Sequence, residues 1–239
     1  MQTVIVAGPP AGGKTSVIFH ALSVLKKKGI RPAVVKIDCL ETDDDRIYAK
    51  LDIPIAVGLS QDICPDHFYA VNFEEMVCWA KEQKAELLVI ETAGLCHRCA
   101  PGIENVFTLC VVDCLSSIKA PRKIGPVITT SDLIVLTKSD MVSQAEREVF
   151  RAQLSLINPR ALLLEVNGLT AGGAEVLADL IRESAVFGKK SITEESRLRH
   201  PLPTAICSYC MGEKRLGNKY QQGVVYKMDF TARGVSHYA

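Results

Sequence analysis

The sequence predicts an α/β protein built on a doubly wound, mainly parallel sheet, with a small cysteine-containing, β-like C-terminal extension. Apolar runs of strand length alternate with segments of helical periodicity over residues 1–187. A glycine-rich turn follows the first apolar run and leads directly into a helix. Beyond this region the chain becomes charged and is interrupted by proline. We therefore expect one domain over residues 1–187 and a linker with the extension over residues 188–239.

The composition is that of an ordinary globular protein. Of 239 residues, 48% are hydrophobic and 23% are charged, and the formal net charge is +1. Such a charge gives no electrostatic basis for binding nucleic acid or an anionic membrane. No apolar stretch approaches the roughly 20 residues that a membrane span needs. We expect a cytoplasmic protein, in which nine cysteines indicate metal, cluster or redox chemistry more than disulfides.

The glycine-rich turn is a phosphate-binding motif. Gly8-Pro9-Pro10-Ala11-Gly12-Gly13-Lys14-Thr15 matches G-x-x-x-x-G-K-S/T at every fixed position, between an apolar strand and a helix. The backbone N–H groups of such a turn surround a polyphosphate, Lys14 reaches its terminal phosphates, and the Thr15 hydroxyl can ligate Mg²⁺. An ordinary glycine-rich turn would not need the lysine and the hydroxyl. The motif predicts a nucleoside-triphosphate site.

Acidic residues follow two strands beside this motif. Residues 32–37 form the second strand, which ends at Asp38, and a buried-type strand over residues 86–90 ends at Glu91. Ligands bind at the carboxyl ends of strands in open α/β sheets, so both acids are placed to hold Mg²⁺ or orient the attacking water. Gly94 follows, where its N–H would face the γ-phosphate. The catalytic residues expected are Lys14, Asp38 and Glu91, and the Mg²⁺ residues expected are Thr15, Asp38 and Glu91.

The rest of the domain continues the alternation. Further strands are expected over residues 53–57, 106–113, 132–136 and 161–166, and helices over residues 72–84, 144–157 and 174–184. Asn72 is the expected N-cap of the first of these helices. The charged run Asp43-Asp44-Asp45-Arg46 is interpreted as a solvated loop or a first helical turn.

Thr137-Lys138-Ser139-Asp140 at the end of one strand predicts selection of guanine. An aspartate two residues after a lysine can accept both N–H groups of the guanine edge, while the lysine stem packs on the base. The expected nucleotide is therefore GTP. The nucleotide-binding residues expected are Gly8, Ala11, Gly12, Gly13, Lys14, Thr15, Ser16, Gly94, Lys138, Asp140 and Asn167.

Three cysteine groups are candidate metal sites. Cys64-Pro65-Asp66-His67 places a thiolate and an imidazole in one loop, which is weak evidence alone. Cys96-His97-Arg98-Cys99 is a C-x-x-C directly after the predicted γ-phosphate sensor, where ligation fits better than a redox dithiol. Cys207-Ser208-Tyr209-Cys210, between β-like runs at 204–206 and 222–230, resembles half of a zinc ribbon, or is a reduced surface dithiol. The candidate ligands are Cys64, His67, Cys96, Cys99, Cys207 and Cys210.

Together these motifs resemble the SIMIBI-class P-loop GTPases of the CobW/HypB/UreG family, which includes the urease- and hydrogenase-accessory metallochaperones. The resemblance spans roughly residues 1–185 and includes the P-loop, with Pro9 where a related iron-protein branch carries a second lysine. It also includes Asp38, the segments 64–67 and 91–94, and residues 120–132, which are close to the urease-accessory protein. There are three departures: one residue is inserted in the Cys-Pro-His element, Thr137 replaces the usual asparagine, and the two C-x-x-C pairs are additional.

The resemblance implies a slow, Mg²⁺-dependent GTPase that dimerises with GTP, traps Ni²⁺ or Zn²⁺ and releases it to a client metalloenzyme or its maturation complex. Two copies of Cys96 and Cys99 across a two-fold axis would supply four thiolates, which suit Zn²⁺ or a 4Fe–4S cluster. Two alternatives stay open. One is a nucleotide-gated, dimeric iron–sulfur electron-transfer or activation protein, and the other is a regulatory GTP switch with structural zinc. Thr137 leaves ATP open as the nucleotide.

Overall fold

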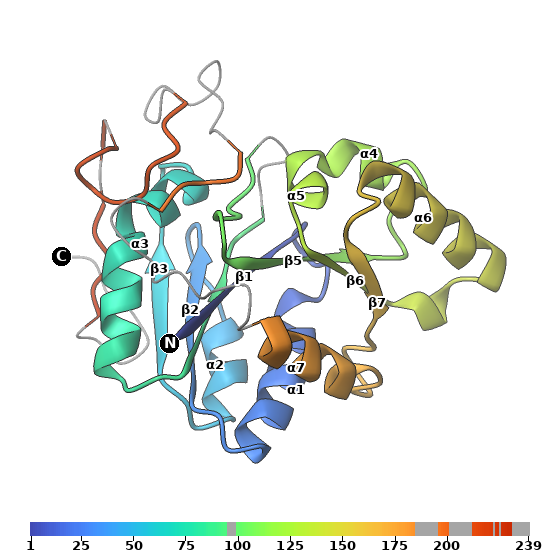
Figure 1. The fold of residues 1–239 in the computed structure, drawn as a ribbon, viewed down its shortest axis with the longest axis horizontal. Coiled ribbons are helices and arrows are strands. Elements are labelled where there is room, and N and C mark those ends of the chain that lie inside the picture. Colours follow the sequence, from blue (N-terminus) through green and yellow to red (C-terminus); the bar gives the residue numbers. More distant parts are fainter. Residues whose placement is uncertain (95–98, 185–195, 201–211, 222, 225, 231–239) are drawn as a thin grey trace.

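The chain folds around a seven-stranded, all-parallel sheet with helices on both faces (Figure 1). The computed structural model describes residues 1–94, 99–184, 196–200, 212–221, 223–224 and 226–230. The strand order is β3-β2-β4-β1-β5-β6-β7, and every neighbouring pair is parallel. The predicted doubly wound sheet is therefore confirmed. Among these residues, no helix is both long and apolar enough to cross a membrane.

The elements lie close to where the sequence pattern places them. The strands are β1 (Gln2–Ala7), β2 (Pro32–Asp38), β3 (Ile55–Leu59), β4 (Leu87–Glu91), β5 (Phe107–Asp113), β6 (Leu133–Thr137) and β7 (Leu162–Glu165). The helices are α1 (Lys14–Lys27), α2 (Asp44–Ala49), α3 (Pro65–Glu82), α4 (Ala120–Ile124), α5 (Pro126–Thr129), α6 (Gln144–Ile157) and α7 (Ala174–Glu183). A short 3-10 turn spans Ser139–Met141.

The central strands are buried on both faces, so their sequences read as continuous apolar runs rather than as alternating ones. On one face, α1, α2 and α7 pack over residues such as Val6 and Val34. On the other face, α3 covers residues such as Ile5 and Val35, and α4 to α6 cover the β5–β7 half. Lys36 and Glu91 interrupt these apolar runs, and both are almost fully buried.

α3 begins at Pro65, so the expected N-cap at Asn72 is wrong. Proline is favoured in the first helical turn because its missing N–H group needs no partner there. Asn72 lies fully buried inside the helix. Its Nδ2 donates to the carbonyl oxygens of Phe68 and Tyr226, each over 2.9 Å, and its Oδ1 accepts from the N–H of Met228 over 2.9 Å. The asparagine fastens the C-terminal segment to α3 instead of starting the helix.

The described residues beyond position 195, which we term the C-terminal arm, pack on the same core as α3. Leu198, Leu216 and Met228 are buried in the cluster that α3 forms with the sheet, and Figure 1 shows the arm lying over this helix. The described residues of the β-like run expected at 222–230 form no strand. Isolated bridges join Ile103 to Leu198 and Arg197 to Arg215. The run expected at 204–206 lies outside the described residues.

Arg199 anchors the arm to the parallel sheet. Its guanidinium donates to both carboxylate oxygens of Asp132, each over 2.8 Å, in the bidentate geometry that suits arginine. Its remaining bonds go to the carbonyl oxygens of Ile103, Val106 and Thr130. One side chain therefore joins the arm to the segment before β5 and to the start of β6.

Replacing Arg199 should loosen the arm. We expect Arg199→Leu to lower the free energy of unfolding by about 1–3 kcal/mol, because Asp132 loses its partner and three carbonyl oxygens lose a donor. Urea denaturation measures this change. Arg197→Leu, at an exposed position two residues away, is the matched control and should stay within about 0.5 kcal/mol of the parent. Equal effects of the two substitutions would contradict the anchoring role.

Candidate functional site

The P-loop joins β1 to α1 at the carboxyl edge of the sheet, in a conformation that depends on glycine. Gly8 has a φ of 133°, and a Cβ there would lie 2.1 Å from the carbonyl oxygen of Val111. Gly13 is the N-cap of α1 in the left-handed region, and no side chain caps the helix. The first N–H groups of α1 are thus available to an anion, with the helix dipole behind them.

A cavity of about 300 Å³ opens over the P-loop. Its lining brings together the P-loop, the ends of β2 and β4 and the start of α2, as expected where carboxyl ends of parallel strands meet. The lining residues are Pro10, Ala11, Gly13, Lys14, Thr15, Ser16, Lys36, Asp38, Asp44, Ile47, Glu91 and Ala93. The structure therefore collects the sequence-predicted catalytic and Mg²⁺ residues around one space.

Lys14 is held by backbone carbonyl groups beside this cavity. Its Nζ donates to the carbonyl oxygens of Gly8 and Pro9, each over 3.0 Å, and to that of Ala93 over 3.5 Å. Burial lowers the pKa of Lys14, and the nearby Glu91 carboxylate opposes this effect. The ammonium group is thus fixed at the edge of the P-loop by acceptors that a phosphate could replace.

Glu91 is the most buried charged group of the cavity, with no exposed surface. Its Oε1 accepts from Thr15 Oγ1 and from Lys36 Nζ, each over 2.8 Å, and its Oε2 accepts from the Tyr48 hydroxyl over 2.5 Å. Because the Thr15 hydroxyl donates its hydrogen bond to Glu91, the lone pairs of the Thr15 oxygen remain available to ligate a cation. A hydroxyl and neighbouring carboxylates are the hard oxygen donors that Mg²⁺ prefers, so these residues fit that ion.

Lys36 and Asp44 belong to the cavity although the sequence analysis did not single them out. The Lys36 side chain is 4% exposed, and its Nζ lies 2.6 Å from Asp44, 2.8 Å from Glu91 and 3.7 Å from Asp38. Burial disfavours the charge of Lys36, but Glu91 and Asp44 outweigh it and raise its pKa. A lysine within an apolar strand was the available signal. Asp44 was hidden in a charge run that was interpreted as solvated.

Gly94 lies three residues after the end of β4 and touches the P-loop. Its φ is 75°, and a Cβ there would lie 1.8 Å from the carbonyl oxygen of Gly8 and 3.1 Å from Lys14 Nζ. Only glycine fits this approach. Cys99 follows a few residues later in the sequence, so a short stretch of chain separates the contact of Gly94 with the P-loop from a thiol.

The residues expected to recognise the base lie at the end of β6, beside the P-loop. Thr137 Oγ1 donates to the carbonyl oxygen of Gly12 over 2.7 Å, and Lys138 Nζ donates to that of Ala11 over 2.9 Å. Asp140 is exposed nearby on the 3-10 turn. Thr137 thus braces the P-loop from the position where the family resemblance expects asparagine.

Asn167 shapes the neighbouring loop. Its Oδ1 accepts from the N–H groups of Leu169 and Thr170, each over 2.9 Å. The following carbonyl, of Gly168, lies 3.0 Å from Nε2 of His20 on α1. The loop is therefore positioned beside the helix that starts at the P-loop.

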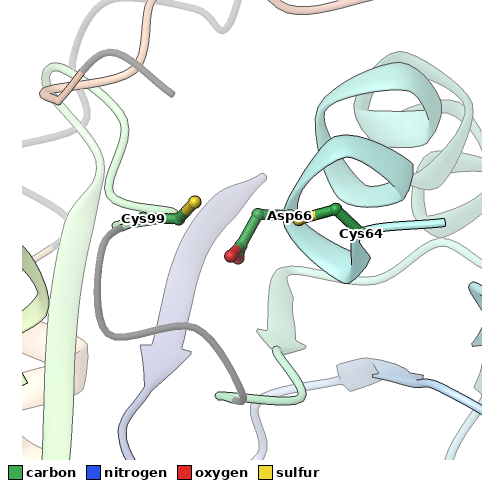
Figure 2. Close-up of side chains that lie close together, drawn as sticks. All are labelled: Cys64, Asp66 and Cys99. Carbon is green, nitrogen blue, oxygen red and sulfur yellow. The ribbon is translucent and has the colours of Figure 1, made fainter. Parts of the chain in front are cut away.

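A second group of ligand-type side chains joins the start of α3 to the segment after β4 (Figure 2). One ligand atom from each of Cys64, Asp66 and Cys99 lies within 4.8 Å of the other two. Asp66 and Cys99 are buried, and Cys64 is partly buried. We call these three residues the thiolate group.

The electrostatics of the thiolate group favour a bound cation. The Cys99 side chain, together with the N–H groups of His67 and Asp66 at the helix start, lowers the pKa of Cys64 to about 6 against the effect of burial. Burial and then the charge of Cys64 raise the pKa of Asp66 to about 7. A thiolate beside a buried carboxyl group is a charge arrangement that a cation would stabilise. Sulfur and carboxylate donors suit Zn²⁺ and related ions.

The candidate metal ligands predicted from the sequence are only partly brought together. His67 is not a member of the thiolate group, because its Nε2 lies 3.2 Å from the carbonyl oxygen of Val224 on the C-terminal arm. Successive helical residues point about 100° apart, which separates His67 from its neighbour Asp66. Asp66, which was not considered as a ligand, joins the cysteines instead. Cys96, Cys207 and Cys210 lie outside the described residues.

Known proteins share this arrangement of motifs and fold. Residues 2–165 match the model of the CobW/HypB/UreG nucleotide-binding domain. Uncharacterized protein MJ0120 of Methanocaldococcus jannaschii is 52% identical over 229 residues, which cover 96% of this chain and 97% of that protein. Urease accessory protein UreG of Yersinia pestis is 26% identical over 197 residues, which cover 76% of this chain and 89% of UreG.

A solved structure supports the same fold. HypB from Helicobacter pylori, in complex with nickel, superimposes with a TM-score of 0.64 at 16% identity, covering 81% of this chain and 91% of HypB. The likeness extends over most of both chains and shows the fold.

The contact of Gly94 with the P-loop can be tested against a matched glycine. We expect Gly94→Ala to weaken GTP binding by about 100-fold or more, because the new Cβ displaces the carbonyl of Gly8 beside Lys14. Titration of a fluorescent GTP analogue measures the affinity. Gly29→Ala is the control, since Gly29 also has a positive φ but a Cβ there meets nothing within 4 Å. Parental affinity in Gly94→Ala would refute the role of this contact.

Proposed function

This chain belongs to the CobW/HypB/UreG family of P-loop GTPases, and we propose that it is a GTP-hydrolysing metallochaperone or maturation factor. In this proposal the thiolate group binds a metal ion and delivers it to a client metalloenzyme or its maturation complex. The observation that carries the proposal is the short connection from Gly94, which touches the P-loop, to Cys99 of the thiolate group. The named functions of UreG and the nickel bound to HypB are consistent with it.

For nucleotide binding and hydrolysis, the proposal assigns roles to the P-loop and to four side chains of the cavity. The N–H groups of the P-loop and Lys14 bind the phosphates, and Lys14 stabilises the charge that develops on the transferred phosphoryl group. Thr15, Asp38 and Glu91 would hold Mg²⁺, which would neutralise charge on the phosphates. Asp38, with its side chain 30% exposed at the end of β2, orients the water that attacks the γ-phosphorus. The products are GDP and phosphate.

The segment after β4 couples this chemistry to the metal. The carbonyl of Ala93 accepts from Lys14, and Gly94 packs on the carbonyl of Gly8. Loss of the γ-phosphate changes what Lys14 and the Gly94 N–H group bind, and the resulting shift reaches Cys99 through the chain. Cys96 lies in the same stretch and is a further ligand in this proposal, as are Cys207 and Cys210. A GTP-dependent homodimer would bring two such groups together.

The donor set favours a single ion over a cluster. Iron–sulfur clusters are held mainly by cysteine thiolates, whereas Asp66 contributes an oxygen. Two thiolates and a carboxylate match Zn²⁺ or Ni²⁺ better. The ion is the cargo of the protein in this proposal, so its binding must be reversible and must depend on the nucleotide.

GTP should change the metal affinity, and the thiolate group should be required. We expect Cys99→Ser to weaken Zn²⁺ binding by about tenfold or more, because a thiolate donor is lost, and we expect a GTP analogue to shift the affinity of the parent protein. Competition with a chromogenic chelator under anaerobic conditions measures both. Cys78→Ser removes an exposed thiol of α3 and serves as the control. Nucleotide-independent affinity, or iron with acid-labile sulfide, would contradict the proposal.

Guanine selection rests on Asp140. Asp140→Asn should weaken GTP binding by about 100-fold, because the amide presents a donor to the N–H groups of the guanine edge. The same variant should gain affinity for xanthosine triphosphate, whose carbonyl at that edge accepts from the amide. Competition against a fluorescent nucleotide measures both affinities. Equal binding of ATP and GTP by the parent protein would refute the assignment of this residue.

A further inference from the structure

Lys36 is a charged group of the cavity to which the proposed reaction assigns no role. It lies within β2, directly opposite Glu91 in the parallel register of β2 and β4. Its neighbours on the strand, Val35 and Ile37, are fully buried apolar residues. A lysine at such a position loses hydration and side-chain entropy, which its ion pairs must offset. Packing alone would be served by a valine or isoleucine, so the ammonium group itself calls for an explanation.

The ammonium group lies where a divalent cation would also be attracted. Lys36 Nζ and Thr15 Oγ1 both donate to the same oxygen, Oε1 of Glu91, each over 2.8 Å. The lysine therefore sits next to the hydroxyl that is expected to ligate Mg²⁺. It also lies 2.6 Å from Asp44 and 3.7 Å from Asp38. Three carboxylates thus converge on one tethered positive charge.

The charge balance of the cavity depends on this lysine. The ionisable side chains of the lining are those of Lys14, Lys36, Asp38, Asp44 and Glu91, which together carry a net charge of −1. Without Lys36 the net charge would be −2, carried by oxygens of the type that bind divalent ions. The Lys36 ammonium therefore neutralises part of the charge of carboxylates that could otherwise bind a divalent cation.

We propose that Lys36 is a tethered cation that occupies the carboxylate cluster of the nucleotide-free protein, so that a divalent ion enters only together with the triphosphate. This role rests on the proposed placement of nucleotide and Mg²⁺ in the cavity. For a lone divalent ion, repulsion by Lys36 and Lys14 offsets most of the attraction of the three carboxylates. The triphosphate brings its own negative charges, which offset that repulsion. Lys36 is a positioning residue here, and it acts on substrate entry rather than on the bond that breaks.

The experiment is a titration of the nucleotide-free protein with Mn²⁺ as the probe, with unbound Mn²⁺ measured by electron paramagnetic resonance. Lys36→Met should bind Mn²⁺ without nucleotide about tenfold or more tightly than the parent protein, because one repelling charge is gone. Lys27→Met removes the same charge from an exposed position on α1 and should leave the affinity unchanged. Parental Mn²⁺ affinity in a folded Lys36→Met protein would overturn the proposal.

A second variant keeps the test decisive if Lys36→Met does not fold. Asp44→Asn removes a carboxylate that is 28% exposed and brings the net charge of the cavity lining from −1 to 0, while Lys36 stays in place. This variant should bind GTP severalfold more tightly in the presence of a chelator that removes divalent ions, and it should gain no affinity for Mn²⁺ alone. Unchanged or weaker chelator-resistant GTP binding would count against the tethered-cation role.

The parent protein separates this proposal from the one on which it rests. Addition of Mn²⁺ together with a non-hydrolysable GTP analogue should give about one bound ion per chain. Absence of that binding would refute the placement of nucleotide and Mg²⁺ in the cavity. If the parent protein binds Mn²⁺ with the GTP analogue, but Lys36→Met shows no gain in Mn²⁺ affinity without nucleotide, only the role of Lys36 is refuted.

Discussion

The buried carboxylate of Glu91 is the interaction on which the rest of the nucleotide cavity depends. Burying an ionised carboxylate costs several kcal/mol unless it is paired and fully hydrogen-bonded. Its three donors come from different elements, namely Thr15 of the P-loop, Lys36 of β2 and Tyr48 of α2. The P-loop, the neighbouring strand and the following helix must therefore be in place together for the charge to be tolerated. This requirement assembles the cavity before any ligand arrives.

The thiolate group is supported by a different part of the chain. Cys64 is the N-cap of α3 and Asp66 lies in its first turn, and the C-terminal arm holds this helix through Asn72. Cys99 precedes Ile103, which forms a bridge with Leu198 of the arm. Both halves of the thiolate group are thus braced by the arm, whereas the nucleotide cavity is lined by the P-loop domain. The backbone after Gly94 is one covalent connection between the two sites, and Cys39, next to Asp38, is a second neighbour of Cys64 and Asp66.

Sequence patterns predicted the sheet, the P-loop and the acids at the strand ends because those features depend on local periodicity and fixed spacing. The start of α3 was missed because the apolar stretch before Asn72 is buried on several sides and shows no amphipathic period. Lys36 and Asp44 were missed because their meaning comes from the parallel register of β2 with β4 and from the return of α2. Asp66 was missed because only the helix start turns it toward Cys99. Long-range pairing, not composition, brings these residues to the cavity and to the thiolate group.

The two sites differ in donor chemistry, and that difference gives Lys36 its significance. A protein that carries Zn²⁺ or Ni²⁺ faces a selectivity problem, because such ions bind most oxygen sites more tightly than Mg²⁺ does. A bare cluster of Asp38, Asp44 and Glu91 would therefore compete with the thiolate group for the cargo. A tethered ammonium group cannot be displaced by dilution or exchange, and it disfavours any divalent ion that arrives without a triphosphate. Under the two proposals, the cargo of the nucleotide-free protein would bind to sulfur, and Mg²⁺ would enter the oxygen site with GTP.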